Sequence, residues 1–145
     1  MKVMAIDYGD ARTGVALSDA GGSIVGRAAV VPSYNPDKAL AALTALAKEN
    51  GVERLVVGLP RNMDGSEGER AALCRDFAAR LSEASGLRAD LWDERRTTVD
   101  AHRILSDNRR FGKKRKEQVD AVAASLILEG YLDFLRRNGG GCRTE

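Results

Sequence analysis

Acidic residues interrupt the sequence at three places where apolar residues or strand ends are expected. The first is Asp7, which ends the apolar run "VMAI" and shares a strand face with Val3 and Ala5 by simple alternation. An ionised carboxylate in apolar surroundings is costly unless a cation, a metal or several backbone N–H groups accompany it. Asp7 is therefore the first candidate for a functional carboxylate.

The second acid is Asp120, in the stretch "VDAVAASLILEGYLDFL". Ala124, Ile127 and Leu128 follow it at offsets of four, seven and eight, which places Asp120 on or beside the core-facing stripe of a helix. The alternative is a purely structural acid in the first turn, stabilised by the helix dipole.

The third place is the pair Asp93 and Glu94, which closes the run "LRADLW". Alternation puts the two acids on opposite faces of a strand and leaves open which one faces Asp7. A surface ion pair with Arg95 or Arg96 is the structural alternative, and such pairs contribute about 0–1 kcal/mol.

Carboxylates from two strand ends and one helix start can meet at one edge of a sheet. Oxygen ligands suit Mg²⁺ or Mn²⁺, and the spacing of Cys74, His102 and Cys142 makes no zinc site. Two such ions about 3.5–4 Å apart activate a water and stabilise the leaving oxygen of a phosphodiester. Convergence of the three acids would therefore indicate metal-dependent phosphodiester hydrolysis.

The elements that must position these acids follow from periodicity and turn residues. Three strands come first, then strands and helices alternate, and two helices end the chain. This order predicts a mixed sheet with helices on both faces, in a single domain over residues 1–138 with a flexible tail at 139–145. The strands are expected at 2–9, 13–19, 22–32, 53–60 and 87–96, and the helices at 36–50, 65–86, 97–107 and 116–137.

Positive charge is concentrated in residues 108–116, "NRRFGKKRK", which we call the basic segment. It ends four residues before Asp120, and without its six basic residues the chain has 17 basic and 21 acidic residues (23 − 6 against 21). We expect phosphate binding there, although a solvated connection between two helices is the alternative. The six expected contacts are Arg109, Arg110, Lys113, Lys114, Arg115 and Lys116.

The stretch "GLPRNMDGSEGERA" runs from an expected strand into an expected helix. Its backbone N–H groups can meet a phosphate at the helix N-terminus, or it is simply a turn and a cap. It lacks the P-loop pattern. Asp64 is a secondary candidate for a metal or water contact, as is Asp93, and Arg12 and Arg61 are candidate phosphate contacts.

Four blocks together resemble the YqgF/RuvX family of pre-16S rRNA nucleases, also called Holliday-junction-resolvase-like proteins. The blocks are "AIDYGDARTGVALSD", "VVGLPRNMDGSEGERA", "DERRTT" and "QVDAVAASLIL". The resemblance implies a ribonuclease H-like fold with sheet order 3-2-1-4-5, and an acidic site of Asp7, Glu94 and Asp120. It is the resemblance, not alternation, that selects Glu94 over Asp93.

The resemblance also implies a metal-dependent endonuclease that processes the 5′ end of precursor 16S rRNA, with two Mg²⁺ or Mn²⁺ ions. Three alternatives stay open. One is a resolvase of branched DNA, which needs a homodimer rather than a monomer, and another is a non-catalytic nucleic-acid-binding protein. "DYGDARTG" also resembles the first phosphate loop of actin-like kinases, but 145 residues leave no room for their second domain. A chain without a membrane-spanning run is expected in the cytoplasm.

Overall fold

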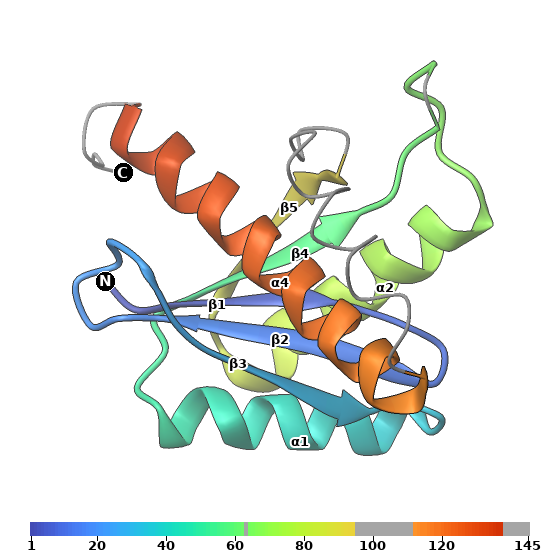
Figure 1. Ribbon diagram of the computed structural model, residues 1–145, viewed down its shortest axis with the longest axis horizontal. Coiled ribbons are helices and arrows are strands. Elements are labelled where there is room, and N and C mark those ends of the chain that lie inside the picture. The colour runs from blue at the N-terminus through green and yellow to red at the C-terminus, as the bar shows by residue number, and fades with distance from the viewer. Residues whose placement is uncertain (63, 95–111, 138–145) are drawn as a thin grey trace.

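The protein is described by a computed structural model, which covers residues 1–62, 64–94 and 112–137, with side chains from 121 onward in the last range. Five strands form one sheet in the order β3-β2-β1-β4-β5 (Figure 1). Strands β1 to β3 pair antiparallel, whereas β4 is parallel to both β1 and β5, so the predicted mixed sheet is confirmed. The strands are β1 (Val3–Asp7), β2 (Arg12–Ser18), β3 (Val25–Pro32), β4 (Arg54–Leu59) and β5 (Arg88–Asp93).

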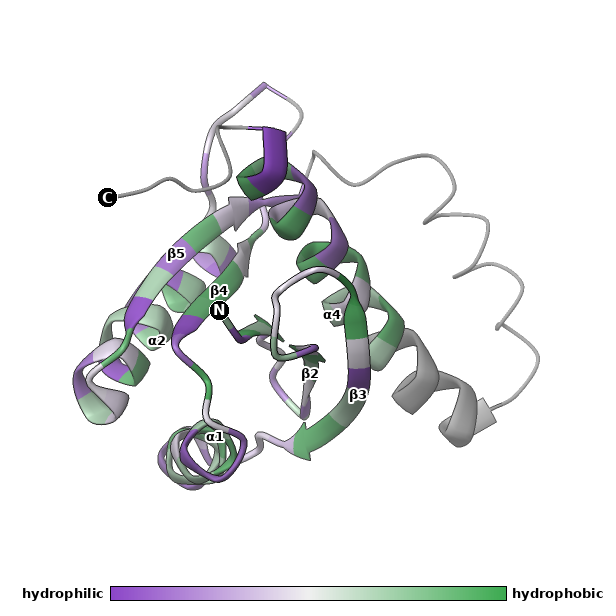
Figure 2. Ribbon diagram, turned by 90° about the vertical axis from the view of Figure 1, so that its left-hand side faces the viewer, coloured by the Kyte–Doolittle hydropathy of each residue, from purple (hydrophilic) through white to green (hydrophobic). Residues whose placement is uncertain are grey.

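Helices cover both faces of this sheet, also as predicted. Figure 2 shows α1 (Pro36–Glu49) and α2 (Glu69–Ser85) on one side and α4 (Gly112–Arg137) on the other. The Asn35 side chain accepts hydrogen bonds from two backbone N–H groups at the start of α1, and Gly86, with a φ of 75°, ends α2. These capping residues explain why α1 begins and α2 ends where the sequence predicted, whereas α2 begins at Glu69, four residues after its predicted start at 65.

The two larger of three apolar clusters follow from the alternation of side chains along the strands. Met4 and Ile6 of β1 pack toward α1 and α2, against Leu43 and Phe77 among others. Val3 and Ala5 pack on the other face with residues of α4. The face that carries Val3 and Ala5, here called the α4 face, is therefore the one toward which Asp7 projects.

Helix α4 begins at Gly112, four residues before the predicted start at 116. Residues 112–116 of the basic segment therefore belong to the first turns of this helix instead of a connection between helices. The helix predicted at 97–107 and the tail at 139–145 lie outside the described residues. Among the described helices, none is long and apolar enough to cross a membrane.

Candidate functional site

Asp7 lies at the carboxyl end of β1, half-buried on the α4 face. It pairs with Gly14 of β2, and the parallel register of Ile6 with Val57 makes Gly58 of β4 its neighbour on the other side. Two glycines therefore flank Asp7 on the adjacent strands. No side chain from either position covers its carboxylate.

Glu94 follows directly after β5, and its side chain reaches back across Gly58. A Cβ atom placed on Gly58 would lie 3.3 Å from both Cγ and Cδ of Glu94, and 2.6 Å from Cδ1 of Ile127 in α4. Because Gly58 is the neighbour of Asp7 on β4, and neighbouring strands are about 4.8 Å apart, Asp7 and Glu94 lie on the same face of the sheet at the position of this glycine. We call this group of Asp7, Gly58 and Glu94 the carboxylate edge.

Gly58 was not a candidate in the sequence, yet it supplies the space in which Glu94 lies. A glycine inside the buried run "RLVVGL" was the available signal, because such a glycine marks a close approach by another group. The sequence could not say which group approaches.

Asp93 faces away from the carboxylate edge. It shares the α1 and α2 face with Ala89 and Leu91, whereas Trp92 packs in the α4-side core. Its Oδ2 lies 3.8 Å from Nη1 of Arg61. The structure thus places Glu94 on the same face as Asp7, and Asp93 on the other face beside an arginine.

Asp120 lies in α4, one turn before Ala124 and two turns before Ile127. Ala124, Ile127 and Leu128 are buried against the sheet, as their spacing predicted. The Asp120 side chain lies outside the described part of the chain. The side chains that are described hold no group of three His, Cys, Asp or Glu residues able to bind a metal, so the predicted centre depends on Asp120 as its third ligand.

The electrostatics of the carboxylate edge agree with this placement. Burial raises the pKa of Glu94, the nearby Arg70 charge opposes that rise, and Asp93 adds to it. Burial also raises the pKa of the Cys74 thiol to about 11, with smaller contributions from several charges that include both Glu94 and Asp7. Two acids 87 positions apart in the sequence (94 − 7) thus act on the same thiol.

Arg70, in the first turn of α2, is a residue of this site that the sequence analysis missed. Its guanidinium donates hydrogen bonds to the Tyr8 carbonyl and, at 2.8 Å, to Oδ1 of Asp10. It also lies 5.3 Å from the centroid of the Tyr8 ring, which stacks on Phe77. A positive charge in the first turn of a helix is unfavourable to the helix dipole. An arginine at this position of the sequence therefore indicates that its guanidinium interacts with a group outside the helix.

The turn between β1 and β2 is closed by Gly9. A Cβ atom there would lie 2.1 Å from the Arg12 carbonyl oxygen, so the turn itself requires glycine. Arg12 begins β2 and shares the α4 face with Gly14 and Ala16, which places this candidate phosphate contact on the same face as Asp7.

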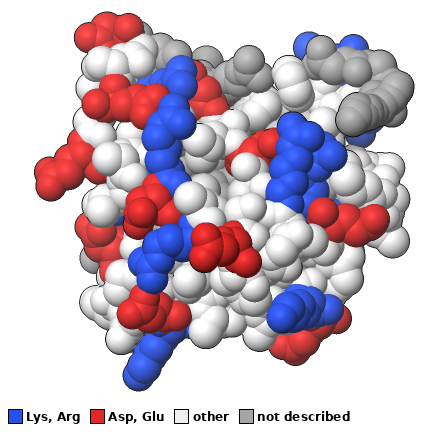
Figure 3. All heavy atoms as spheres, turned by 180° about the vertical axis from the view of Figure 1, so that it is seen from behind, with Lys and Arg blue, Asp and Glu red and all other residues white. Residues whose placement is uncertain are grey.

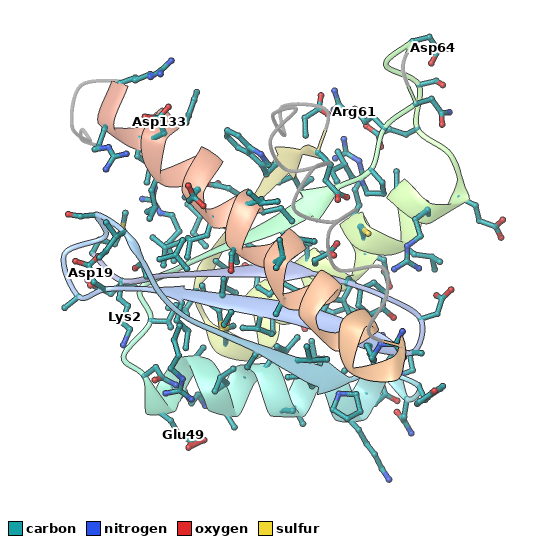
Figure 4. All side chains as sticks on the ribbon, in the orientation of Figure 1. Lys2, Asp19, Glu49, Arg61, Asp64 and Asp133 are labelled. Atoms are coloured by element: carbon teal, nitrogen blue, oxygen red, sulfur yellow. The ribbon has the colours of Figure 1, made fainter. Side chains whose placement is uncertain are left out.

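Asp64 lies apart from the carboxylate edge. Figure 4 places it at the outer tip of the loop between β4 and α2, and its Oδ1 accepts hydrogen bonds from Ser66 N and Oγ at 2.9 and 2.6 Å. Arg61, in the same loop, lies 3.2 Å from Glu67. The structure therefore gives both residues contacts within or beside this loop and does not bring Asp64 to Asp7.

Four of the basic residues lie in the first turns of α4, before Asp120 in the helix: Lys113, Lys114, Arg115 and Lys116. The side chains of these four residues lie outside the described part of the chain. Arg109 and Arg110 lie outside it as whole residues.

The raised pKa of Glu94 predicts a pH dependence of stability. Protonated Glu94 favours the folded, metal-free protein below the carboxyl's ordinary pKa, and this contribution is lost as pH rises through the raised value. In EDTA, the free energy of unfolding should therefore fall over that pH range more steeply in the wild type than in Glu94→Gln. Urea unfolding at a series of pH values measures this difference. Equal slopes in the two proteins would contradict the assignment.

A model of the RuvX family, described as "Holliday junction resolvase", matches residues 1–134. The chain belongs to the RuvX family. The resemblance of the four sequence blocks is thereby confirmed, and with it the class of enzyme, a nuclease that hydrolyses phosphodiester bonds.

Relatives of this chain that carry the name "Putative pre-16S rRNA nuclease" include proteins from two bacteria. The protein from Moorella thermoacetica is 45% identical over 139 residues, covering 96% of this chain and 99% of its own. The protein from Halothermothrix orenii is 41% identical over 140 residues, covering 97% and 100%. Among solved structures, Thermus thermophilus RuvC in complex with a Holliday junction superposes with a TM-score of 0.62 at 12% identity, covering 92% of this chain and 96% of RuvC. This likeness confirms the ribonuclease H-like fold.

Proposed function

We propose that this RuvX protein is a divalent-metal-dependent endonuclease that processes the 5′ end of precursor 16S rRNA. The observation that carries the proposal is the placement of Asp7 and Glu94 on the face covered by α4, with Glu94 beside Gly58, the neighbour of Asp7 on β4. Two carboxylates with an acid from α4 form an oxygen-only ligand set, which fits Mg²⁺ or Mn²⁺. Asp7, Glu94 and Asp120 are the proposed ligands of two ions.

Bound metal would supply an activated water and stabilise the leaving oxygen of the phosphodiester. The residues of the chain hold and orient the site. Glu94 must lose its proton before it can bind a cation, so its raised pKa makes metal affinity increase with pH. Arg70 moderates that rise, and its contacts with Tyr8 and Asp10 fix the turn that follows Asp7.

The substrate is proposed to approach from the α4 face. Arg12 lies on that face, and the basic segment leads into α4. In contrast, Figure 3 shows acidic and basic side chains interleaved on the face seen from behind. A surface of mixed sign gives little attraction to a polyanion, which is why we place the nucleic acid on the opposite side.

The second candidate function is resolution of four-way DNA junctions in recombination and repair, which the description of the family model favours. Symmetric cutting of two arms requires a two-fold dimer, whereas cleavage of rRNA is compatible with a monomer. In the deciding assay, the purified protein and Mg²⁺ or Mn²⁺ are incubated with precursor 16S rRNA in one reaction and with a four-way DNA junction in another. The oligomeric state of the protein is measured alongside. Cleavage of the rRNA alone supports the proposal, and cleavage of the junction alone supports the second candidate. Binding without cleavage of either would identify a non-catalytic nucleic-acid-binding protein.

The basic segment yields a quantitative prediction. If its six cations contact phosphates, the slope of log affinity against log salt should be steep, with each contact contributing about −0.7 to −0.9. Replacing Lys113, Lys114, Arg115 and Lys116 by Gln should flatten the slope by about three units. Fluorescence anisotropy with labelled RNA over a range of salt concentrations measures it. An unchanged slope would remove the segment from the binding surface.

A further inference from the structure

Tyr34, in the connection between β3 and α1, exposes its side chain almost completely. Its relative exposure is 80%, the highest of the exposed large apolar residues in the described part of the chain. Ile24, the next, is 64% exposed. A ring this exposed contributes little to folding, so the stability of the domain does not explain its presence.

The backbone on either side of Tyr34 is held in place. Ser33 is buried, and it donates hydrogen bonds from Oγ to the Gly9 carbonyl at 2.6 Å and from N to the Ala11 carbonyl at 2.9 Å. On the other side, the Asn35 side chain caps α1 and Pro36 begins the helix. An exposed ring on a fixed backbone is prepared to bind a flat ligand at a low cost in entropy.

These contacts connect Tyr34 to the carboxylate edge. Ser33 is bonded to the turn that directly follows Asp7, and Pro32 pairs with Arg12. Strand β3 lies two strands away from β1 in the sheet, a lateral distance of about 10 Å. Tyr34 therefore lies at the same end of the first three strands as Asp7, within a span of a few nucleotides.

We propose that Tyr34 stacks on a nucleobase of the substrate strand a few nucleotides from the phosphodiester at the carboxylate edge. This inference rests on the proposed nuclease function. Aromatic side chains bind bases of single strands by stacking, largely without sequence preference, because every base has a π-face. Arg12, on the α4 face between Asp7 and Pro32, is suited to contact the intervening phosphates.

The test measures binding apart from cleavage. A short single-stranded RNA containing 2-aminopurine is titrated with the full chain in EDTA, and both fluorescence and anisotropy are recorded. Tyr34→Ala should weaken binding about tenfold and abolish the change in 2-aminopurine fluorescence, whereas Tyr34→Trp should preserve both. Because the ring is exposed, Tyr34→Ala should unfold at the wild-type temperature. Its salt slope should equal that of the wild type, since stacking releases no counterions.

Ile24→Ala is the matched control, because it removes an exposed apolar side chain from the β2–β3 turn, at the far end of β2 from Arg12. It should leave affinity unchanged. Three results would each overturn the inference. Tyr34→Ala could bind RNA as tightly as the wild type, Ile24→Ala could lose as much affinity as Tyr34→Ala, or the wild type could fail to bind the RNA. A different result would show that the nuclease proposal fails. The wild type would then bind the RNA through Tyr34 but would not cleave it when metal is added.

Discussion

Replacing Asp7 by Asn is expected to lower the rate of metal-dependent cleavage about a thousandfold or more, a change of about 4 kcal/mol in activation free energy. Asn keeps the size of the side chain but removes the charge that would hold a cation on the α4 face. Folding should be retained, because Asp7 is only half-buried at the end of its strand. Initial rates of cleavage at saturating Mg²⁺ or Mn²⁺ measure the effect.

Metal binding provides a second measurement on the same variant. A ligand that binds only the folded state stabilises it by about 2.7 kcal/mol at a concentration one hundred times its Kd. The wild type should therefore unfold at a higher temperature with metal than in EDTA, and Asp7→Asn should lose most of this increase. RNA affinity in EDTA should be retained, because removal of a negative charge does not weaken attraction to a polyanion.

Asp10→Asn is the matched control for Asp7→Asn. Asp10 lies three residues further along the same turn, and its side chain is 89% exposed and paired with Arg70. Exposed pairs contribute about 0–1 kcal/mol, so this variant should cut RNA at close to the wild-type rate. Cleavage retained in Asp7→Asn, or lost equally in Asp10→Asn, would contradict the role of Asp7 as a metal ligand.

Gly58→Ala is expected to impair both stability and cleavage, because its methyl group would enter the space above the strand. The new Cβ would lie 2.6 Å from Cδ1 of Ile127, which is buried, and 3.3 Å from two atoms of Glu94. Overpacking of this kind costs about 1–3 kcal/mol of unfolding free energy. Displacement of Glu94 should in addition lower the cleavage rate tenfold or more at a temperature where the variant is fully folded.

A second substitution separates the two effects. Ile127→Val removes Cδ1, the atom in closest conflict with the added methyl, at a cost of about 0.5–1.5 kcal/mol on its own. The double variant should recover stability relative to Gly58→Ala, while cleavage stays low because the contact with Glu94 persists. Urea unfolding and initial rates measure the two quantities in the four proteins of the cycle.

Gly68→Ala controls for the loss of a glycine as such. Gly68 is the N-cap residue of α2, outside the sheet, and a Cβ atom there meets nothing within 4 Å. It should leave cleavage unchanged. If Gly58→Ala cut RNA as fast as the wild type, Gly58 would not be the space that Glu94 requires.

The order and type of the described elements follow from the local sequence alone. Alternation in β1, helical spacing in α4, and the turn residues around α1 and α2 each depend on contacts between near neighbours, which the local sequence encodes. The same local patterns singled out Asp7 and Asp120 as acids on apolar faces. The start of α4 was placed too late because Lys and Arg are good helix formers, so a run of charge does not end a helix.

Which residues lie together at the carboxylate edge depends on long-range packing. Alternation put Asp93 and Glu94 on opposite faces of β5 but could not say which of these faces is covered by α4. The covered face depends on the packing of Trp92 with Ile127, and these two residues are distant in sequence. The space above Gly58 and the effect of the Arg70 charge on the pKa of Glu94 likewise depend on strands and helices brought together across long loops. A pattern within one element fixes a side chain's face, whereas the partner on that face is set by the register and packing of other elements.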